Sequence, residues 1–569
     1  VIQFYLFFKA GNLHQIGKDF LDISIFHFQL PAGKFIFLYF LSWVMTFLMF
    51  FAFPKNQGVK KSCFLILSLS LLFRLAVFSL EPSDDINRYL WEGKLVAEGI
   101  SPYHSPPLSF KGEDIATEDP YFAKINHPDI PAAYPPMTLF LFAGISKISY
   151  SYGAVKATVL LFDMGVIWVF LLLLIRRKTD VRWAVLYGFN PLVIYSFAGQ
   201  GHFDSIQIFF LLVALLFHDQ RKWALMFISL GIGIQIKYVA ALGVPFFLNR
   251  ENLRQAWILG IAVLMPYLPF TGKDIMPLFS GISTFGADYA FNGSIHSLLR
   301  AIFQDIDTAS RISGSVFFFC LLMLMFMRLS SKLKPIFHDP ANGTFYALGA
   351  LLLLSPTVHF WYIAWILPFA IIKRSFAWIV LTFFMGFYFV VTGIFYHTGK
   401  WEFPVIYQVF VWLFFILFFM AEGFYFFKRL FHTQRFKHPV SVSVIIPCLN
   451  EEDHIEECIL HVRKDNAVKE IIVVDAGSLD KTVFIAQKMG TKIILHRSEP
   501  GSGGGRGGQI LAGLKGAKGD VVAIVHADTR VGPQIFSKML KVLANDPGII
   551  GGSVGGVFDS GGIKLKLIE

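Results

Sequence analysis

Long apolar runs set the strongest constraint on the fold of this chain. Apolar stretches recur from residue 35 to residue 427, and a helix of about 20 such residues spans the hydrocarbon core of a bilayer. Hydrophobic residues make up 55% of the 569 residues, against about 45–50% in soluble domains. The pattern predicts a multi-spanning α-helical membrane region over residues 1–430, with about 11 to 13 helices.

The basic residues indicate how this region is oriented. The net charge is +11, but Lys and Arg cluster beside the apolar runs, as expected of cytoplasmic loops, so no nucleic-acid partner is predicted. The basic linker 431–440 is predicted to be cytoplasmic, together with the polar region 441–569. The four cysteines show neither a disulfide framework nor zinc-ligand spacing. We therefore expect a multi-pass protein of a bacterial-type inner (plasma) membrane.

The same topology gathers polar residues on the outer face, from positions far apart in sequence: Asp84, Asp85, His202, Asp204, Lys237 and His359. The first external loop, 81–135, is predicted to open with a helix over 84–98 that lies along the membrane surface. The apolar stretch 136–150 is short for a span and is expected to be interfacial or re-entrant. A long external loop is expected over 272–312.

Asp84 and Asp85 follow an apolar run that ends at Leu80. Carboxylates at a membrane boundary are costly unless they have a function, and adjacent ones raise each other's pKa, which suits one of them as a general base. The sequence does not show which of the two carboxylates is the base. Arg88, one helical turn further, is expected to pair with them or with phosphate. The competing interpretation is an exposed helix N-cap with Ser83 as the cap.

Other outer-face residues have structural alternatives as well. Lys237 and His359 are candidates for binding a lipid phosphate, although an interfacial lysine can also simply snorkel. His202 and His359 could equally be structural histidines. An aromatic belt is the alternative to substrate stacking for three residues, Trp91, Trp361 and Tyr362.

Short motifs stand in order between residues 80 and 370: 84–93 (DDINRYLWEG), 99–103 (GISPY), 126–128 (NHP), 134–136 (YPP), 201–204 (GHFD), 236–238 (IKY) and 355–362 (SPTVHFWY). They resemble the GT-C glycosyltransferases, in particular the bacterial membrane mannosyltransferase-like group. The resemblance implies transfer of mannose or another hexose from polyprenyl phosphate, with inversion, by Asp84 or Asp85. It implies a set of lipid-phosphate or substrate-binding residues: Arg88, Trp91, Glu92, Tyr103, His127, His202, Asp204, Lys237 and His359. A metal requirement for this half stays open.

Residues 441–569 alternate short apolar strands with helices. Strands are predicted at 441–447, 470–475, 491–495 and 521–525, which favours a parallel sheet with ligands at the carboxyl ends of its strands. A glycine-rich run over 501–508 is expected to approach a diphosphate, with a flexible linker as the alternative.

Motifs at 450–451 (NE), 475–482 (DAGSLDKT), 505–509 (GRGGQ) and 526–530 (HADTR) resemble glycosyltransferase family 2, of the GT-A fold. The resemblance implies a nucleotide-diphosphate sugar bound by Asn450, Glu451, Asp475, Ser478, Asp480, Arg506 and Gln509. It implies Mg²⁺ or Mn²⁺ on Asp528, with His526 where the common Asp-x-Asp motif has its first Asp. Strand-end capping is the alternative for Asp475 and Asp528.

The catalytic base of this family lies in the second half of its domain, and no matching motif follows Gly556. We therefore expect an incomplete family 2 domain, and a first residue other than Met agrees with a fragment. Two other function classes stay open: a lipid or sugar transporter or flippase with a regulatory nucleotide-sugar-binding tail, suggested by an interrupted helix near Lys237, and a membrane anchor for the soluble enzyme.

Overall fold

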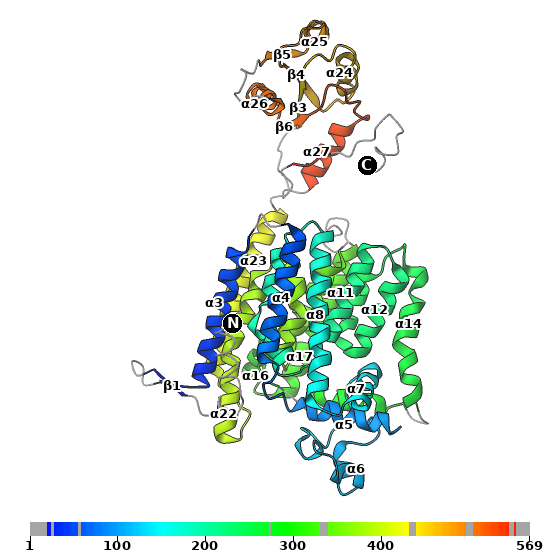
Figure 1. Cartoon of the computed structure of the whole chain (residues 1–569), viewed down its shortest axis with the longest axis vertical. Coiled ribbons are helices and arrows are strands. Elements are labelled where there is room, and N and C mark those ends of the chain that lie inside the picture. The colour runs from blue at the N-terminus through cyan, green and yellow to red at the C-terminus, as the bar shows by residue number, and fades with distance from the viewer. Residues whose placement is uncertain are drawn as a thin grey trace. The chain divides into compact units, whose positions relative to one another are not determined.

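The chain divides into two units, Val1–Glu422 and Gly423–Glu569. The computed structural model describes residues 20–23, 28–54, 58–271, 275–288, 290–329, 339–431, 440–496, 505–545 and 551–553. The first unit is built of helices and the second surrounds a small parallel sheet (Figure 1). This confirms the predicted sequence of a helical region followed by an α/β domain.

A hairpin of β1 (Phe20–Ile23) and β2 (Phe28–Pro31) precedes the helices of the first unit. The main helices are α3 (Gly33–Ala52), α4 (Val59–Val77), α5 (Asp85–Ala97), α6 (Asp114–Thr117), α7 (Pro136–Ile148), α8 (Tyr152–Arg176), α11 (Asp204–Asp219), α12 (Trp223–Ile236), α14 (Trp257–Leu264), α15 (Pro277–Asp288), α16 (Ile295–Phe303), α17 (Ile306–Leu329), α19 (Pro340–Leu354), α20 (Ile363–Lys373), α21 (Phe376–Phe384), α22 (Val390–Thr398) and α23 (Val405–Phe431). Short segments between them include α9 (Val185–Gly188), α10 (Pro191–Ile194), the π-helix η5 (Tyr195–Gly199), η6 (Tyr238–Gly243), α13 (Val244–Phe247), η9 (Phe360–Tyr362) and η10 (Met385–Phe389).

Within the described residues, six helical stretches are long and apolar enough to cross a membrane: Gly33–Ala52, Tyr152–Arg176, Leu253–Phe270, Ile306–Leu329, Phe376–Phe395 and Val405–Phe424. The pair Pro191–Gly199 and Asp204–Asp219, bent by 117°, is a seventh candidate, and shorter apolar helices pack among them. Large apolar side chains face outward on α17, where Phe318, Phe319 and Phe326 are 63%, 63% and 73% exposed. Such a surface requires lipid rather than water around it.

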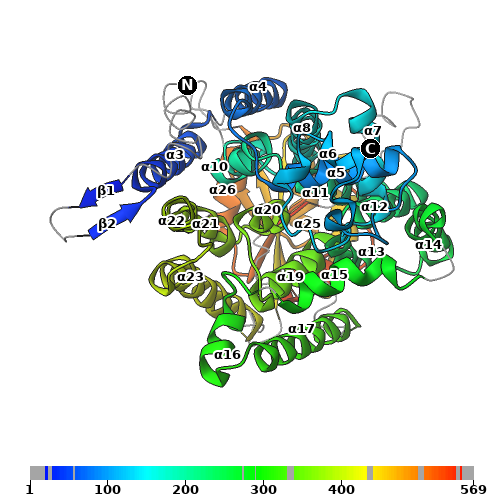
Figure 2. The same ribbon diagram turned by 90° about the horizontal axis from the view of Figure 1, so that it is seen from below.

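The predicted surface helix and the short apolar helix lie together as α5 and α7, at one end of the bundle (Figure 1). Figure 2 shows α5 lying across the ends of helices that are seen nearly end-on. A Cβ on Gly93 of α5 would lie 2.6 Å from the carbonyl of Phe142 in α7, so the glycine allows this close packing. The chain enters α8 from the same end, where the Tyr152 hydroxyl donates to Asn87 of α5 at 2.6 Å. The short helix α7 therefore does not carry the chain to the other end of the bundle. This agrees with the expectation of an interfacial or re-entrant helix.

The segment 272–312, predicted to be a long external loop, instead contains α15, α16 and the start of α17. The first turn of α17 is stabilised by Asp305, whose carboxylate accepts from the backbone of Thr308 at 2.8 Å. This capping extends the helix over a polar stretch that hydropathy alone assigns to a loop.

The second unit has a four-stranded parallel sheet of order β5-β4-β3-β6. Its elements are β3 (Val442–Cys448), α24 (Ile455–Arg463), β4 (Val468–Asp475), α25 (Thr482–Lys488), β5 (Lys492–Leu495), α26 (Arg506–Gly516), β6 (Val521–Ile524) and α27 (Ile535–Asn545). All seven residues of β3 are buried, which explains its uninterrupted apolar sequence. The predicted strands are confirmed, and their carboxyl ends lie at one edge of the sheet.

Candidate functional site

The carboxylates at the start of α5 meet two residues from other segments. The Asn126 amide donates to Asp85 at 2.8 Å and to Asp84 at 3.3 Å. The Nδ1 atom of His202 lies 3.5 Å from Oδ2 of Asp85. Asp84 occupies the N-cap position of α5, but its side chain makes no capping hydrogen bond. The Ser83 hydroxyl accepts from Asp85 N at 3.4 Å, so Ser83 contributes to the cap as the alternative interpretation expects. The contacts of both carboxylates with Asn126, and of Asp85 with His202, are compatible with a functional pair as well.

The two carboxyl groups differ in their electrostatic surroundings. Desolvation by the surrounding protein and the neighbouring charge of Asp85 raise the pKa of Asp84. Desolvation acts on Asp85 in the same direction, but the His202 imidazole and the Asn126 amide outweigh it and hold the pKa of Asp85 below its ordinary value. Asp84 is also the more exposed of the two. Asp85 is therefore a fixed anion, whereas Asp84 is better suited to accept a proton.

A second ion pair lies beside this one, between Lys237 after α12 and Asp204 at the start of α11. The ammonium group is 2.5 Å from Oδ1 of Asp204, which also accepts from the indole of Trp365 at 2.5 Å. Rings of Phe203, Tyr362 and Trp365 surround the ammonium at 5.1–5.2 Å. Aromatic faces attract a cation, so Lys237 is held in place rather than snorkelling freely.

His359 joins the two pairs from the loop before η9. Its Nδ1 atom lies 2.8 Å from the Tyr388 hydroxyl. Burial lowers the pKa of His359 to about 4, and the charges of Asp85, His202, Lys237 and Asp204 all act on it. The imidazole is uncharged at neutral pH, so it does not add a positive charge beside Lys237. A role for His359 as a charged phosphate ligand is therefore not supported.

Helix ends assemble this site: the start of α5, the start of α11, the end of α12 and the start of α20 (Figures 1 and 2). Several buried polar atoms of His202 and the start of α11 lack a hydrogen-bond partner in the part of the chain that the structure describes: both ring nitrogens of His202, Oδ2 of Asp204 and both amide atoms of Gln207. Unsatisfied buried polar groups are rare in folded proteins and are typical of sites that receive water or a ligand. The structure thus brings together all six residues predicted to meet on one face.

Arg88 and Glu92, in contrast, lie inside the loop rather than in the site. Arg88 is buried, pairs with Glu92 at 2.7 Å and donates to the carbonyls of Ile130 and Pro131 at 2.6 and 2.8 Å. Another nitrogen of the same guanidinium donates to His127 O at 3.1 Å. The predicted pairing of Arg88 with Asp84, Asp85 or phosphate is wrong in this structure, because every guanidinium nitrogen is engaged in holding the loop.

Two further residues predicted to contact substrate are also occupied within the protein, and a third, His127, contributes its backbone to the loop. Trp91 is fully buried against Phe110 and Phe122. Tyr103 is buried, and its hydroxyl donates to the carbonyl of Tyr134 at 2.6 Å. His127 adopts a positive φ of 46° and contributes its carbonyl to Arg88. These positions stabilise the first external loop.

Two residues of the site were not predicted from the sequence to belong to it. Asn126 belongs to a motif that the sequence offers, yet only the fold shows that its amide spans both carboxylates. Trp365 carries no sequence signal apart from its aromatic character.

In the second unit, the predicted residues gather at the carboxyl ends of the strands. Asp475 ends β4 and is 1% exposed; its carboxylate accepts from the backbone of Gly477 and Ser478 at 2.8 and 2.9 Å and from the Ser478 hydroxyl. Asp480 accepts from Thr482 in the same way. These contacts favour the capping interpretation of Asp475, and direct contact with a nucleotide stays a prediction.

Asn450 and Gln509 also shape the strand ends. Asn450 has a φ of 56°, and its side chain accepts from the backbone of Leu479 at 2.9 Å. The Gln509 amide donates to Cys448 O and Val474 O at 2.9 and 2.8 Å, so it fixes the start of α26 against β3 and β4. Gln509 is therefore placed to position this edge rather than to reach a ligand.

Exposed groups remain for a ligand at this edge. Asp528 and His526 follow β6, and Arg506 begins α26; all three are exposed, and Glu451 is partly exposed. Asp528 and Glu451 lie close enough that both charges act on Cys458. Residues 501–504 of the glycine-rich run lie outside the described residues. Within the described part, no group of three or more His, Cys, Asp or Glu is arranged to hold a metal ion.

Two family matches cover the two units separately. Residues 36–250 match the family described as alpha-(1->6)-mannopyranosyltransferase, N-terminal domain. Residues 443–568 match glycosyl transferase family 2. Fold and families together define the class: both regions are of glycosyltransferase type. More narrowly, the chain joins a region similar to the alpha-(1->6)-mannopyranosyltransferases to a region similar to glycosyl transferase family 2.

Curated relatives cover parts of this architecture. The dolichol-phosphate mannosyltransferase of Pyrococcus furiosus is 34% identical over 137 residues, which are 23% of this chain and 38% of that protein. The glucosyl-3-phosphoglycerate synthase of Petrotoga mobilis is 30% identical over 142 residues, 21% of this chain and 44% of that protein. The alpha-(1->6)-mannopyranosyltransferase B of Corynebacterium glutamicum is 31% identical over 141 residues, 23% of each chain. The chain thus spans less than half the length of these relatives.

Proposed function

We propose that the membrane half transfers a hexose, such as mannose, from polyprenyl phosphate to an acceptor on the outer face of a bacterial-type plasma membrane. The observation that carries this proposal is the carboxylate pair: Asp85 is held by Asn126 and His202 as a fixed anion, beside an exposed Asp84 whose pKa is raised. The match to a mannosyltransferase family supports it.

In the proposed reaction, the acceptor hydroxyl attacks the anomeric carbon. Asp84 takes the hydroxyl proton as the carbon–oxygen bond to the phosphate breaks, and the polyprenyl phosphate leaves. Lys237, next to this pair, stabilises the charge on the leaving phosphate. Because an aromatic cage and Asp204 already position Lys237, little reorganisation is needed when the lipid binds.

The test is transfer of radiolabelled mannose from polyprenyl phosphate mannose by the purified full chain. We expect Asp84→Asn to lower kcat by about 10²- to 10⁴-fold, the usual contribution of a positioned general base. Asp114→Asn is the matched control, since Asp114 is an exposed carboxylate in the same external loop. Transfer that survives Asp84→Asn would remove the proposed base. Exchange of the intact lipid-linked sugar across vesicles without a new product would favour a transporter instead.

The second unit is proposed to bind a nucleotide-diphosphate sugar on the cytoplasmic side. Exposed Asp528 and Arg506 and partly exposed Glu451 around one edge of the sheet support this, as does the family 2 match. A carboxylate together with substrate phosphates is the usual coordination of Mg²⁺, so Asp528 fits a divalent cation that neutralises the diphosphate.

Binding of a labelled nucleotide-diphosphate mannose to the full chain tests this second part. We expect Asp528→Asn to weaken binding about tenfold in the presence of Mg²⁺ and to change it little in EDTA, because the carboxylate acts through the cation. Asp453→Asn, an exposed carboxylate on the same unit, is the control. Equal weakening in both buffers would contradict a metal role for Asp528.

A further inference from the structure

Trp361 lies between two imidazole rings of the proposed membrane site. On one face, the His202 ring lies 3.7 Å away between centroids, with 13° between the planes. The His359 ring lies 4.4 Å away, with 1° between the planes. Two rings this close to the same indole and nearly parallel to it would overlap on a single face, so the two imidazoles lie on opposite faces. Each face of the indole thus carries an imidazole ring, and Trp361 as a whole is half-buried.

Each histidine in this stack has a further partner. His202 contacts the Asp85 carboxylate at 3.5 Å, and His359 contacts the Tyr388 hydroxyl at 2.8 Å. The stack therefore connects the carboxylate pair on α5 to Tyr388 in η10, more than 300 residues further along the chain. Stacked rings resist rotation and sliding, so the indole restricts both imidazoles.

The loop that carries His202 is fixed to the carboxylate loop from the backbone side as well. Ser83 N donates to Gln200 O at 2.9 Å, and the Gln200 side chain donates to Glu81 O at 3.2 Å. Gly201 has a φ of 79°, and a Cβ there would lie 2.4 Å from Ile86 of α5. These contacts set the backbone position of His202, but not the rotation of its ring.

We propose that Trp361 is a positioning residue of the transfer reaction, which holds the His202 ring against Asp85 by clamping it in the three-ring stack. The inference rests on the proposed function of the membrane half. In this role Trp361 belongs neither to an aromatic belt nor to the residues that stack on a sugar, because both of its faces contact imidazole rings within the protein. Tyr362, the next residue, instead stacks on Trp365 beside Lys237, at 4.2 Å.

Replacing the indole tests this role. We expect Trp361→Leu to lower kcat about 10- to 100-fold, with KM for the lipid-linked sugar changed less than about twofold, since small misplacements near a reacting centre have such effects. Trp361→Phe keeps a ring between the imidazoles and should recover most of the rate. Trp257→Leu, at a tryptophan that is 64% exposed on α14, is the control and should leave kcat unchanged.

The pH profile separates positioning from a merely structural role. The electrostatic interaction with His202 lowers the pKa of Asp84 as well as that of Asp85. When the ring is released in Trp361→Leu, the acid limb of kcat should move to higher pH, and Trp361→Phe should reverse this movement. An unchanged limb and kcat would overturn the proposal, as would a raised KM with unchanged kcat, because that pattern belongs to a substrate-stacking residue.

Two outcomes keep this inference distinct from the proposed function. If Asp84→Asn retains transfer, the proposed function fails. If Asp84→Asn loses transfer while Trp361→Leu behaves like the wild-type protein, only the positioning role fails. Should Trp361→Leu not fold, His359→Leu opens the other face of the indole and is expected to move the acid limb in the same direction; no movement would overturn the proposal.

Discussion

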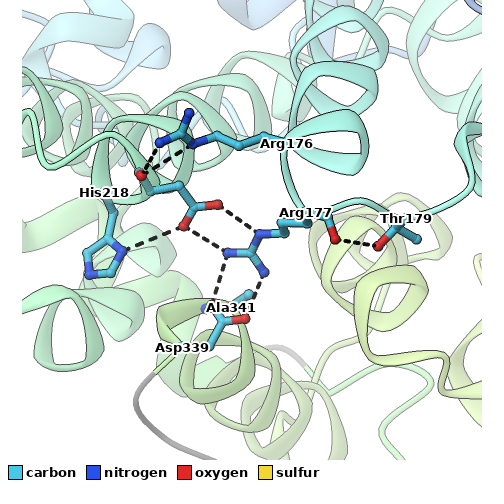
Figure 3. Close-up of polar contacts among 7 residues, drawn as sticks. Arg176, Arg177, Thr179, His218, Asp339 and Ala341 are labelled. Carbon is cyan, nitrogen blue, oxygen red and sulfur yellow. Dashed lines mark hydrogen bonds and ion pairs between the residues drawn. The ribbon is translucent and has the colours of Figure 1, made fainter. Parts of the chain in front are cut away.

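Two polar clusters lie at opposite ends of the helical bundle, and they differ in how completely their charges are matched. At the end of α8, Arg177 donates to Asp219 at 2.9 and 3.1 Å and to Asp339 at 2.7 and 3.1 Å (Figure 3). At the other end, Asp84, Asp85 and Asp204 face one lysine and two histidines, and several buried polar atoms lack partners.

This difference indicates two different roles. The Arg177 cluster joins the ends of three helices, α8, α11 and α19, and Asp339 also caps α19 by accepting from Ala341 N at 3.0 Å (Figure 3). The Arg177 guanidinium and both carboxylates satisfy one another, as in a structural ion pair, although the neighbouring Nδ1 of His218 lies 3.7 Å from Asp219 and has no hydrogen-bond partner among the described residues. The Asp84 end keeps unmatched charge and hydrogen-bonding capacity, which a folded protein retains where a ligand or a reaction uses it.

The largest effect expected from this comparison is a loss of stability when the Arg177 cluster is broken. Arg177→Ala leaves two partly buried carboxylates facing each other without a cation, and we expect the free energy of unfolding to fall by about 2 kcal/mol. Thermal or chemical unfolding of the purified full chain in detergent measures this. Transfer activity per folded molecule should stay unchanged, because the site lies at the other end of α8.

The neighbouring arginine provides the control for that measurement. Arg176 is exposed and donates only to the backbone carbonyl of Asp219, at 2.6 and 3.2 Å. We expect Arg176→Ala to change stability by less than about 0.5 kcal/mol. If Arg177→Ala abolished transfer without lowering stability, the division into a structural end and a functional end would be wrong.

The sequence predicted the parts of the fold that depend on local hydrophobic pattern. Apolar runs predicted the helical region, and the buried pattern of β3 predicted a central parallel strand. The helices α15 and α16 were predicted as part of a loop. They are short and carry polar residues, so the hydropathy of their sequence resembles that of a loop. Their formation depends on caps and packing, which act over distances that a hydropathy window does not see.

For the site, charge patterning predicted which residues meet but not what each one contacts. The positive-inside rule placed Asp84, His202 and Lys237 on one face, and the structure brings them together. It could not show that Arg88 turns into its own loop, because the carbonyls that it binds lie about 40 residues away in sequence. Whether a polar side chain faces the site or the protein is decided by tertiary packing.

The smaller effect that sharpens the comparison is a shift in the pH profile of transfer. Asp84 accepts a proton only when it is ionised, so kcat should fall as the pH drops through the raised pKa of Asp84. Desolvation contributes most to this raised pKa, and the charge of Asp85 adds to it. Asp85→Asn removes that charge and therefore lowers the pKa of Asp84, provided that the His202 ring stays in place.

We therefore expect the acid limb of the pH profile of kcat to move to lower pH in Asp85→Asn. This movement is opposite in direction to that expected for Trp361→Leu. Asp114→Asn should not move it, because Asp114 has no contact with the pair among the described hydrogen bonds and ion pairs. Loss of transfer in Asp85→Asn, together with transfer that survives Asp84→Asn, would mean that Asp85 rather than Asp84 is the base. The two variants together thus decide which carboxylate is the base, a choice that adjacent residues of the same type leave open in the sequence.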